Sequence, residues 1–270
     1  MITFLRYTRL WLSFARFALL GELAFRANFL LKMTVEILWL CILLLFYETI
    51  FSNTRMISGW DKYQYLFFVG CYFALEGLVE TLFLENCQEF SNQIRTGQLD
   101  ASLLQPLDEQ FLITCRRIDW STVPNALMGA GVMIQALLKR GEPVGIVQVT
   151  VFAVVFVCAL LLAYSFLLLL TSSAVWMVRN QSLMELWWLF SSLMRYPREI
   201  FQGVWWASPI GMVFTFLLPV MLIVYVPASE MVRTLEWKYV FFVIFATVVA
   251  LAFSRWFFRR ALKRYRSASS

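Results

Sequence analysis

The chain has 270 residues, of which 61% are hydrophobic and 15% are charged, and Lys and Arg outnumber Asp and Glu by 23 to 17. Soluble domains average about 25% charged residues, and a water-soluble fold of this size could not bury so much apolar surface. The composition therefore excludes a soluble enzyme, a disordered linker and a secreted disulfide scaffold. It predicts an all-α integral membrane protein.

The first 26 residues are predicted to form an interfacial amphipathic helix. Arg6, Arg9 and Arg16, together with Ser13, follow one another at intervals of three, four and three residues, and Trp11 and several leucines occupy the other faces. These arginines interrupt the apolar run that a secretory signal peptide requires. A basic helix with such an apolar face lies in the plane of the membrane surface, on the anionic cytoplasmic leaflet. The alternative is that these residues extend the first membrane span.

Apolar runs long enough to cross a membrane follow in chain order. A spanning helix needs about 20 mostly apolar residues. A shorter apolar run, 183–194, is interpreted as the core of one further helix, which gives about six spans in one transmembrane domain, 1–270. The five long runs are 27–51, 63–84, 121–138, 146–173 and 239–258.

Residues 195–230 are predicted to form a proline-broken, re-entrant extracellular segment before the last helix. Counting both apolar runs of this region as full spans gives seven helices and places the basic termini on opposite sides, which the positive-inside rule disfavours. Six spans place both termini in the cytoplasm. Five residues of this region are assigned to a gate over an exit path: Pro197, Trp205, Trp206, Pro209 and Pro219. The alternative is that they only anchor the segment at the membrane interface.

The longest internal hydrophilic stretch is 85–119, between the second and third spans. The second helix is expected to continue into it as a charged extension and to end at a turn at Thr96 and Gly97. A short amphipathic piece follows, with Leu99, Leu103 and Leu104 expected on one exposed side. Such a piece suits docking into a groove of a soluble partner, or it rests on lipid.

Two runs in this loop resemble the cytoplasmic loop of permease subunits of bacterial ATP-binding cassette (ABC) exporters of the type-2 class. They are the run from Ile94 to Asp100 and the run from Leu103 to Leu107, and Arg195-Tyr196-Pro197 and Leu218-Pro219-Val220 also look like that class. The resemblance implies a coupling helix seated in a cleft of a separate ATPase subunit. Carried over residue by residue, the ATPase contact comprises Ile94, Arg95, Thr96, Gly97, Gln98, Leu99, Asp100, Leu103, Leu104 and Pro106.

The same resemblance defines the expected partners. They are cytosolic ABC ATPase subunits, a second permease subunit that is identical or related, and membrane lipid, with no nucleic acid. No G-x-x-x-x-G-K-[ST] phosphate loop occurs in the chain, so ATP and Mg are expected on the partner ATPase and no cofactor on this subunit. The expected location is the bacterial plasma (inner) membrane, as a multi-pass protein.

Two carboxylates fall inside the second predicted span. Glu76 and Glu80 are four residues apart and share a helix face with Tyr72 nearby. An intramembrane carboxylate is costly and usually faces a cavity or a partner. These residues are therefore assigned to a substrate path or a subunit interface. The alternative is pairing with Lys32 or titration to the neutral form.

Other charges near the membrane have separate interpretations. Glu185 in the fifth helix is a third candidate for lining a pathway, and Lys32 and Glu36 are expected to form a local pair on the first helix.

No catalytic residue and no metal ligand set is assigned. The chain contains no histidine, which excludes a Ser-His or Cys-His nucleophile and a histidine-ligated metal, and its five cysteines are widely spaced. The leading interpretation is a permease subunit without its own ATPase site. The alternatives are a polytopic membrane enzyme acting on lipid, and a passive channel or scaffold.

Overall fold

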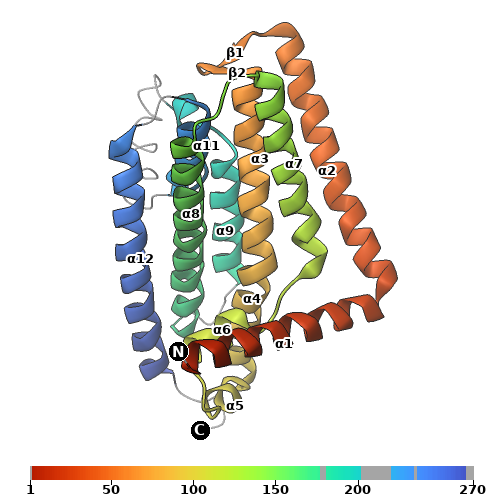
Figure 1. Ribbon diagram of the computed structural model, residues 1–270. Helices are drawn as coiled ribbons and strands as arrows, with labels where there is room; N and C mark the ends of the chain where they lie inside the picture. The colour runs from red at the N-terminus through yellow and green to blue at the C-terminus, as the bar shows by residue number, and fades with distance from the viewer. Residues whose placement is uncertain (1, 177–180, 202–219, 234–235, 266–270) are drawn as a thin grey trace.

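The computed structural model describes residues 2–176, 181–201, 220–233 and 236–265, and nearly all of these residues are helical (Figure 1). The helices are α1 (Ile2–Ala24), α2 (Arg26–Asn53), α3 (Lys62–Val79), α4 (Glu85–Thr96), α5 (Leu99–Leu103), α6 (Glu109–Cys115), α7 (Val123–Arg140), α8 (Ile146–Ser172), α9 (Gln181–Met194), α11 (Val220–Val232) and α12 (Trp237–Arg264). Short strands β1 (Met56–Ile57) and β2 (Trp60–Asp61) form a hairpin between α2 and α3, and one π-helical turn and three 3-10 turns occupy Glu80–Leu84, Trp120–Thr122, Ser173–Val175 and Arg198–Phe201.

Five of the described helices are long and apolar enough to cross a membrane, and they confirm an all-α membrane protein. Each contains one of the five long runs predicted from the sequence. They are Arg26–Asn53, Lys62–Thr96, Trp120–Arg140, Ile146–Val175 and Trp237–Arg264. Helix α9, with 14 residues, is shorter than a full span. Residues 202–219 lie outside the described part, so the sixth span and the re-entrant segment stay predictions.

Helix α1 lies across one end of the bundle, whereas the long helices run side by side (Figure 1). The chain bends at Phe25, whose ψ of 55° is not helical, so α1 does not continue the axis of α2. Two contacts tie α1 to the segment after α5. The Asp108 backbone N–H donates to the Tyr7 hydroxyl at 3.1 Å, and Trp120 Nε1 donates to the Ala15 carbonyl at 2.9 Å.

The exposed side of α1 carries the three arginines of the predicted basic stripe, Arg6, Arg9 and Arg16, whereas Trp11 is half-buried. Large apolar side chains of α1 are exposed too, among them Leu5, Leu12 and Leu20, and a helix lying on a membrane surface presents both basic and apolar side chains to its surroundings.

Small residues allow α3 and α7 to pack closely. A Cβ atom added to Gly129 would lie 2.4 Å from the Ala74 backbone nitrogen, and one added to Gly77 would lie 2.5 Å from the Ala126 nitrogen. Neither position has room for the methyl group of an alanine. Close backbone approach at small residues is the usual basis of helix association in membranes. Helices α3 and α7 therefore form the rigid centre of the bundle.

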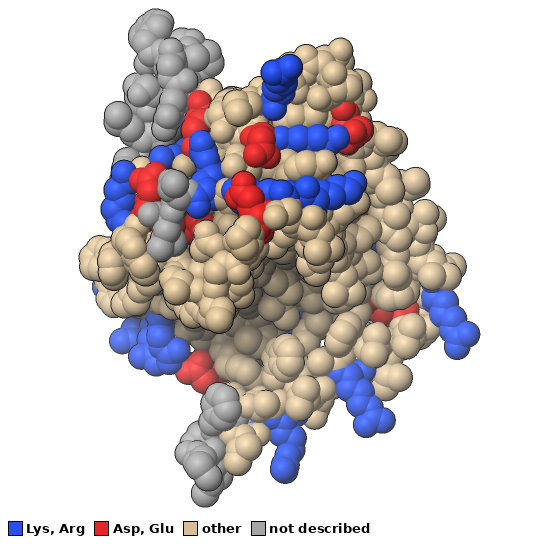
Figure 2. Space-filling model, turned by 45° about the horizontal axis from the view of Figure 1, so that its top comes forward, with Lys and Arg blue, Asp and Glu red and all other residues tan. Residues whose placement is uncertain are grey.

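The β1–β2 hairpin closes the end of the bundle opposite α5 (Figure 1). Its turn contains Gly59 with φ at +79°, a conformation that favours glycine. Asp61 then caps α3, because its carboxylate accepts from the Gln64 N–H at 2.8 Å and the Gln64 side chain accepts from the Asp61 N–H at 3.3 Å. Figure 2 brings this end forward and shows basic and acidic side chains side by side on it.

Candidate functional site

The second long helix joins both ends of the molecule. Helix α3, the π-helical turn and α4 form one continuous helix of 35 residues, Lys62–Thr96. At about 1.5 Å per residue it extends about 50 Å, which exceeds the roughly 30 Å hydrocarbon core of a bilayer. The charged extension predicted from the sequence is thereby confirmed, and it begins at the π-helical turn Glu80–Leu84. Single π turns inside α-helices are often found at functional sites.

The end of α4 follows from local backbone chemistry. Gly97 adopts φ of +73°, and its N–H donates to the Ile94 carbonyl at 3.4 Å, which ends the helix after Thr96. Helix α5 then runs for only five residues and ends at Leu103, ahead of Pro106. The predicted turn and the predicted short helix are both present.

The leucines of this segment do not share one exposed face. Leu104 is 86% exposed, Leu103 is half-buried, and Leu99 is fully buried. The expectation that Leu99 faces outward with the others is therefore wrong, because Leu99 anchors α5 in a small apolar cluster. That cluster comprises Leu99, Phe90, Ile113, Leu168 and Phe258, contributed by α5, α4, α6, α8 and α12.

The other residues assigned to the ATPase contact form a mostly polar surface around Leu104. Arg95 donates to the Asn92 side chain at 3.1 Å on the same helix. The exposed members are Arg95, Thr96, Gln98 and Pro106, and the partly buried ones are Ile94, Gly97 and Asp100.

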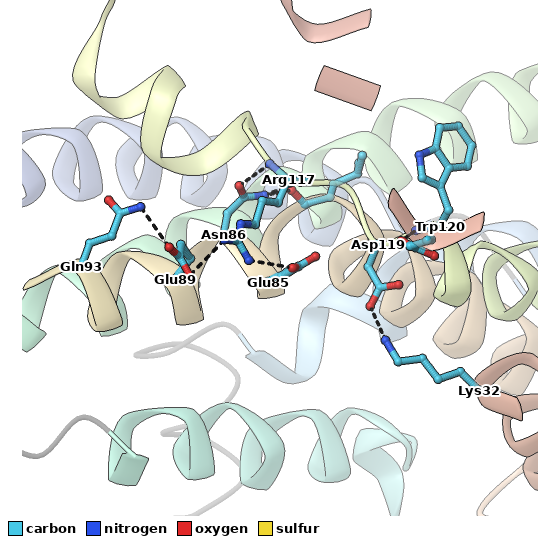
Figure 3. A network of polar contacts seen from close by, with 10 residues as sticks. Lys32, Glu85, Asn86, Glu89, Gln93, Arg117, Asp119 and Trp120 are labelled. Atoms are coloured by element: carbon cyan, nitrogen blue, oxygen red, sulfur yellow. Dashed lines mark hydrogen bonds and ion pairs between the residues drawn. The ribbon is translucent and has the colours of Figure 1, made fainter. Parts of the chain in front are cut away.

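A polar network fixes the segment after α6 to α4 (Figure 3). Asn86, which is 2% exposed, accepts from the Arg117 backbone N–H at 2.7 Å and donates to the Arg117 carbonyl at 2.6 Å. The Arg117 guanidinium contacts Glu85 at 3.1 Å and Glu89 at 3.3 Å. Asn86 thus supplies both hydrogen bonds that a strand neighbour would supply. Sequence reasoning missed this pair, because its members are 31 positions apart.

The same segment reaches α1 and α2. The Trp120 backbone N–H donates to Glu22 Oε1 at 2.7 Å, and Lys32 Nζ lies 3.6 Å from Asp119 Oδ2. The expectation that Lys32 pairs with Glu36 is therefore wrong, because Lys32 pairs with Asp119 instead. Burial raises the pKa of the Glu22 carboxyl, partly offset by the N–H of Trp120.

A groove of about 840 Å³ lies between α1, α4 and α5. Phe14 and Phe17 of α1 form its apolar wall, and Glu85 and Glu89 of α4 form an acidic wall. Phe17 is 79% exposed, which is a large apolar surface at this groove. Exposed apolar surface bordered by polar side chains is typical of a docking surface.

The intramembrane carboxylate Glu76 lies among polar neighbours from its own helix, from α9 and from the segment that follows α9. Its side chain is hydrogen-bonded to Tyr72 and Ser191 and lies near Arg195, whose guanidinium also donates to the Tyr72 hydroxyl at 3.1 Å. The Glu76 side chain thus lies between its own helix, α3, and the end of α9.

Glu80 has surroundings of its own, although the Glu76 carboxylate lies near enough to interact with it. It lines a cavity of about 550 Å³ with Lys32, Glu36 and Asp119, between α2 and the α3–α4 helix. Glu185 is exposed on α9. The structure does not bring Glu185 together with Glu76 or Glu80. The assignment of these residues to a pathway stays a prediction.

Of the residues assigned to an outer gate, only Pro197 falls in the described part of the chain, where it is buried. Trp205, Trp206, Pro209 and Pro219 lie outside the described residues.

Five long apolar helices, a helix crossing one end and an extension beyond the membrane define a polytopic membrane protein. The chain belongs to the ABC-2 transporter family, since its residues 37–269 match the family model described as ABC-2 family transporter protein. It is accordingly a membrane-embedded transport permease subunit, and its family associates in general with an ABC ATPase. No match is found among curated proteins or among solved structures.

Proposed function

We propose that this chain is the membrane-spanning subunit of an ATP-driven exporter, coupled to a separate ATPase subunit through residues 94–106. The observation that carries the proposal is the continuous helix Lys62–Thr96, which leads from the core of the bundle to the exposed Leu104. A displacement imposed at α5 acts directly on the helix at the centre of the bundle.

The contacts around α5 support this transmission. Leu99 packs against α4, α6, α8 and α12, so a force on α5 acts on two further long helices. Arg117 and Asn86 connect α4 to the segment that holds α1 through Trp120. A densely packed interior transmits such a displacement instead of absorbing it.

A second permease subunit is proposed to cover α2. Of the 28 residues of α2, Leu40 and Tyr47 are buried, and nine large apolar side chains between Leu30 and Phe46 are exposed. The cavity lined by Glu80 and Glu36 lies beside this helix. Packing of two copies or of two related permeases along α2 would enclose that cavity and form a pathway between subunits.

The orientation follows from the coupling proposal. The α5 end lies in the cytoplasm, the β1–β2 hairpin lies outside, and α1 rests on the inner leaflet of the bacterial plasma membrane. ATP and Mg are bound by the partner, and this chain supplies the pathway and the docking surface.

Co-purification tests the proposal. The tagged chain, co-expressed with a candidate ABC ATPase subunit, should bring the ATPase down in detergent and stimulate its ATP hydrolysis. Leu104→Asp should abolish both, because it places a charge on the most exposed leucine of the contact. Met56→Asp is the matched control, since Met56 is 66% exposed in the hairpin at the opposite end.

Retention of the ATPase and of stimulated hydrolysis by Leu104→Asp would contradict the coupling assignment. Loss of both in Met56→Asp as well would show that the contact is not confined to the α5 end, and would contradict it equally.

A further inference from the structure

The five residues from Arg195 to Glu199 contact the long helices through three charged side chains. The Arg195 guanidinium donates to the Tyr72 hydroxyl of α3. The Arg198 guanidinium lies 4.4 Å from the ring centroids of Tyr225 in α11 and of Tyr239 in α12. Cations placed over aromatic rings are attracted by the ring quadrupole. The segment thus contacts α3, α11 and α12 within five residues.

Glu199 collects donors from two distant parts of the chain. Its carboxylate accepts from Trp60 Nε1 in β2 at 3.2 Å, from the Tyr225 hydroxyl in α11 at 2.7 Å and from Arg233 at 3.0 Å. The Glu199 side chain is 17% exposed, and Trp60 is fully buried. One carboxylate therefore joins the hairpin between α2 and α3 to the helix that precedes α12.

Arg233 completes the cluster. Its guanidinium lies 4.8 Å from the Trp60 ring centroid and donates to the Gly59 carbonyl in the hairpin turn at 3.2 Å. Gln64 adds a link nearby, because its side chain donates to the Val232 carbonyl at 3.3 Å. The end of α11 is thus tied to the hairpin through Arg233 and to α3 through Gln64.

Moving Glu199 away from both the hairpin and α11 would break these contacts together. The Trp60 indole N–H and the Tyr225 hydroxyl would lose their acceptor, and the carboxylate would lose its cation. Hydrogen bonds to a charged group are among the stronger ones in proteins, and leaving their partners unsatisfied is costly. The cluster therefore opposes any movement that opens the bundle at this end.

We propose that Glu199 is a positioning residue that holds the hairpin end of the permease closed, and that its separation from Trp60 and Arg233 accompanies opening of the exit. The proposal rests on the proposed function, in which the hairpin end faces outward. Glu199, Trp60, Tyr225 and Arg233 are called the outer latch below.

Thiol labelling tests the outer latch on the permease–ATPase complex in detergent. Val232→Cys is the reporter, because Val232 is 1% exposed beside the latch, and mass spectrometry separates its labelling from that of the native cysteines. Cys71, which is fully buried in α3, reports on the integrity of the core in the same sample. The complex is labelled with and without a non-hydrolysable ATP analogue.

Glu199→Gln keeps the shape of the side chain and removes its charge. We expect it to raise the labelling rate at position 232 without nucleotide by about tenfold, which corresponds to about 1.4 kcal/mol. Labelling of Cys71 should stay slow. In the parent complex the analogue should raise labelling at position 232, and in Glu199→Gln it should add little. Trp60→Phe, which removes one N–H donor and keeps a ring, should give a smaller rise.

Glu142→Gln is the matched control, because Glu142 pairs with Arg140 at an exposed site lining the same end. An equal rise in this control, faster labelling of Cys71 in Glu199→Gln, or an unchanged rate at position 232 would each overturn the outer latch. Those results leave ATPase association intact, so they are distinct from failure of the proposed function, in which no ATPase co-purifies.

Discussion

Shortening Leu99 to alanine should release α5 from the bundle, whereas the same change at Leu104 should leave α5 in place. Leu99 is fully buried among five helices and Leu104 is 86% exposed. Truncating a buried leucine to alanine costs about 2–5 kcal/mol, and surface changes usually stay within about 0.5 kcal/mol. At about 1.4 kcal/mol per factor of ten, even the lower value of 2 kcal/mol raises the local opening constant about 30-fold.

Hydrogen exchange followed by mass spectrometry on peptides covering 94–106 measures this opening directly. Leu99→Ala should accelerate exchange there by about 30-fold or more, and Leu104→Ala should leave exchange unchanged while weakening ATPase binding. Equal exchange in the two variants would refute the assignment of Leu99 as the internal anchor and Leu104 as the contact residue.

Three further variants test the packing and the electrostatics of the fold. Gly129→Ala should lower the thermal unfolding midpoint in detergent, because its Cβ would lie 2.4 Å from the Ala74 nitrogen, and Gly131→Ala, with nothing within 4 Å, should not. Asn86→Ala should lower that midpoint and speed exchange in 116–119, since it removes the hydrogen-bond partner of the Arg117 backbone N–H and carbonyl; unchanged exchange would contradict this. Burial raises the pKa of Glu22, so the folded state retains this proton to higher pH than the unfolded state. The contribution of Glu22 to stability should therefore fall as the pH rises from 4.5, the ordinary pKa of a glutamate, through the raised pKa of Glu22. Glu22→Gln should flatten the measured dependence of the unfolding midpoint on pH.

The long helices could be predicted from hydropathy, because a span depends on a local run of apolar residues. The run 146–173 became α8 and its 3-10 turn, Ile146–Val175, with a difference of two residues. The turn at Gly97 could also be predicted, since it depends on the conformational freedom of that residue. Both features are set by neighbours in the sequence.

The parts that failed depend on contacts between distant residues. The outward direction expected for Leu99 was wrong, because Leu168 and Phe258, far along the chain, cover that side of α5. Lys32 pairs with Asp119 and not with Glu36, because the chain bends after α6 toward the start of α2. Glu199 accepts a hydrogen bond from Trp60, which lies 139 positions earlier in the chain, and no local pattern in the sequence indicates this contact.

Site-directed cross-linking at position 104 tests the central claim most directly. The claim is that Leu104 and its neighbours seat against an ABC ATPase. A photoreactive maleimide attached through Leu104→Cys should capture the co-expressed ATPase upon illumination, and the same reagent attached through Met56→Cys should not. Capture of the ATPase from position 56, or its absence at position 104 in a complex that contains the ATPase, would contradict the account.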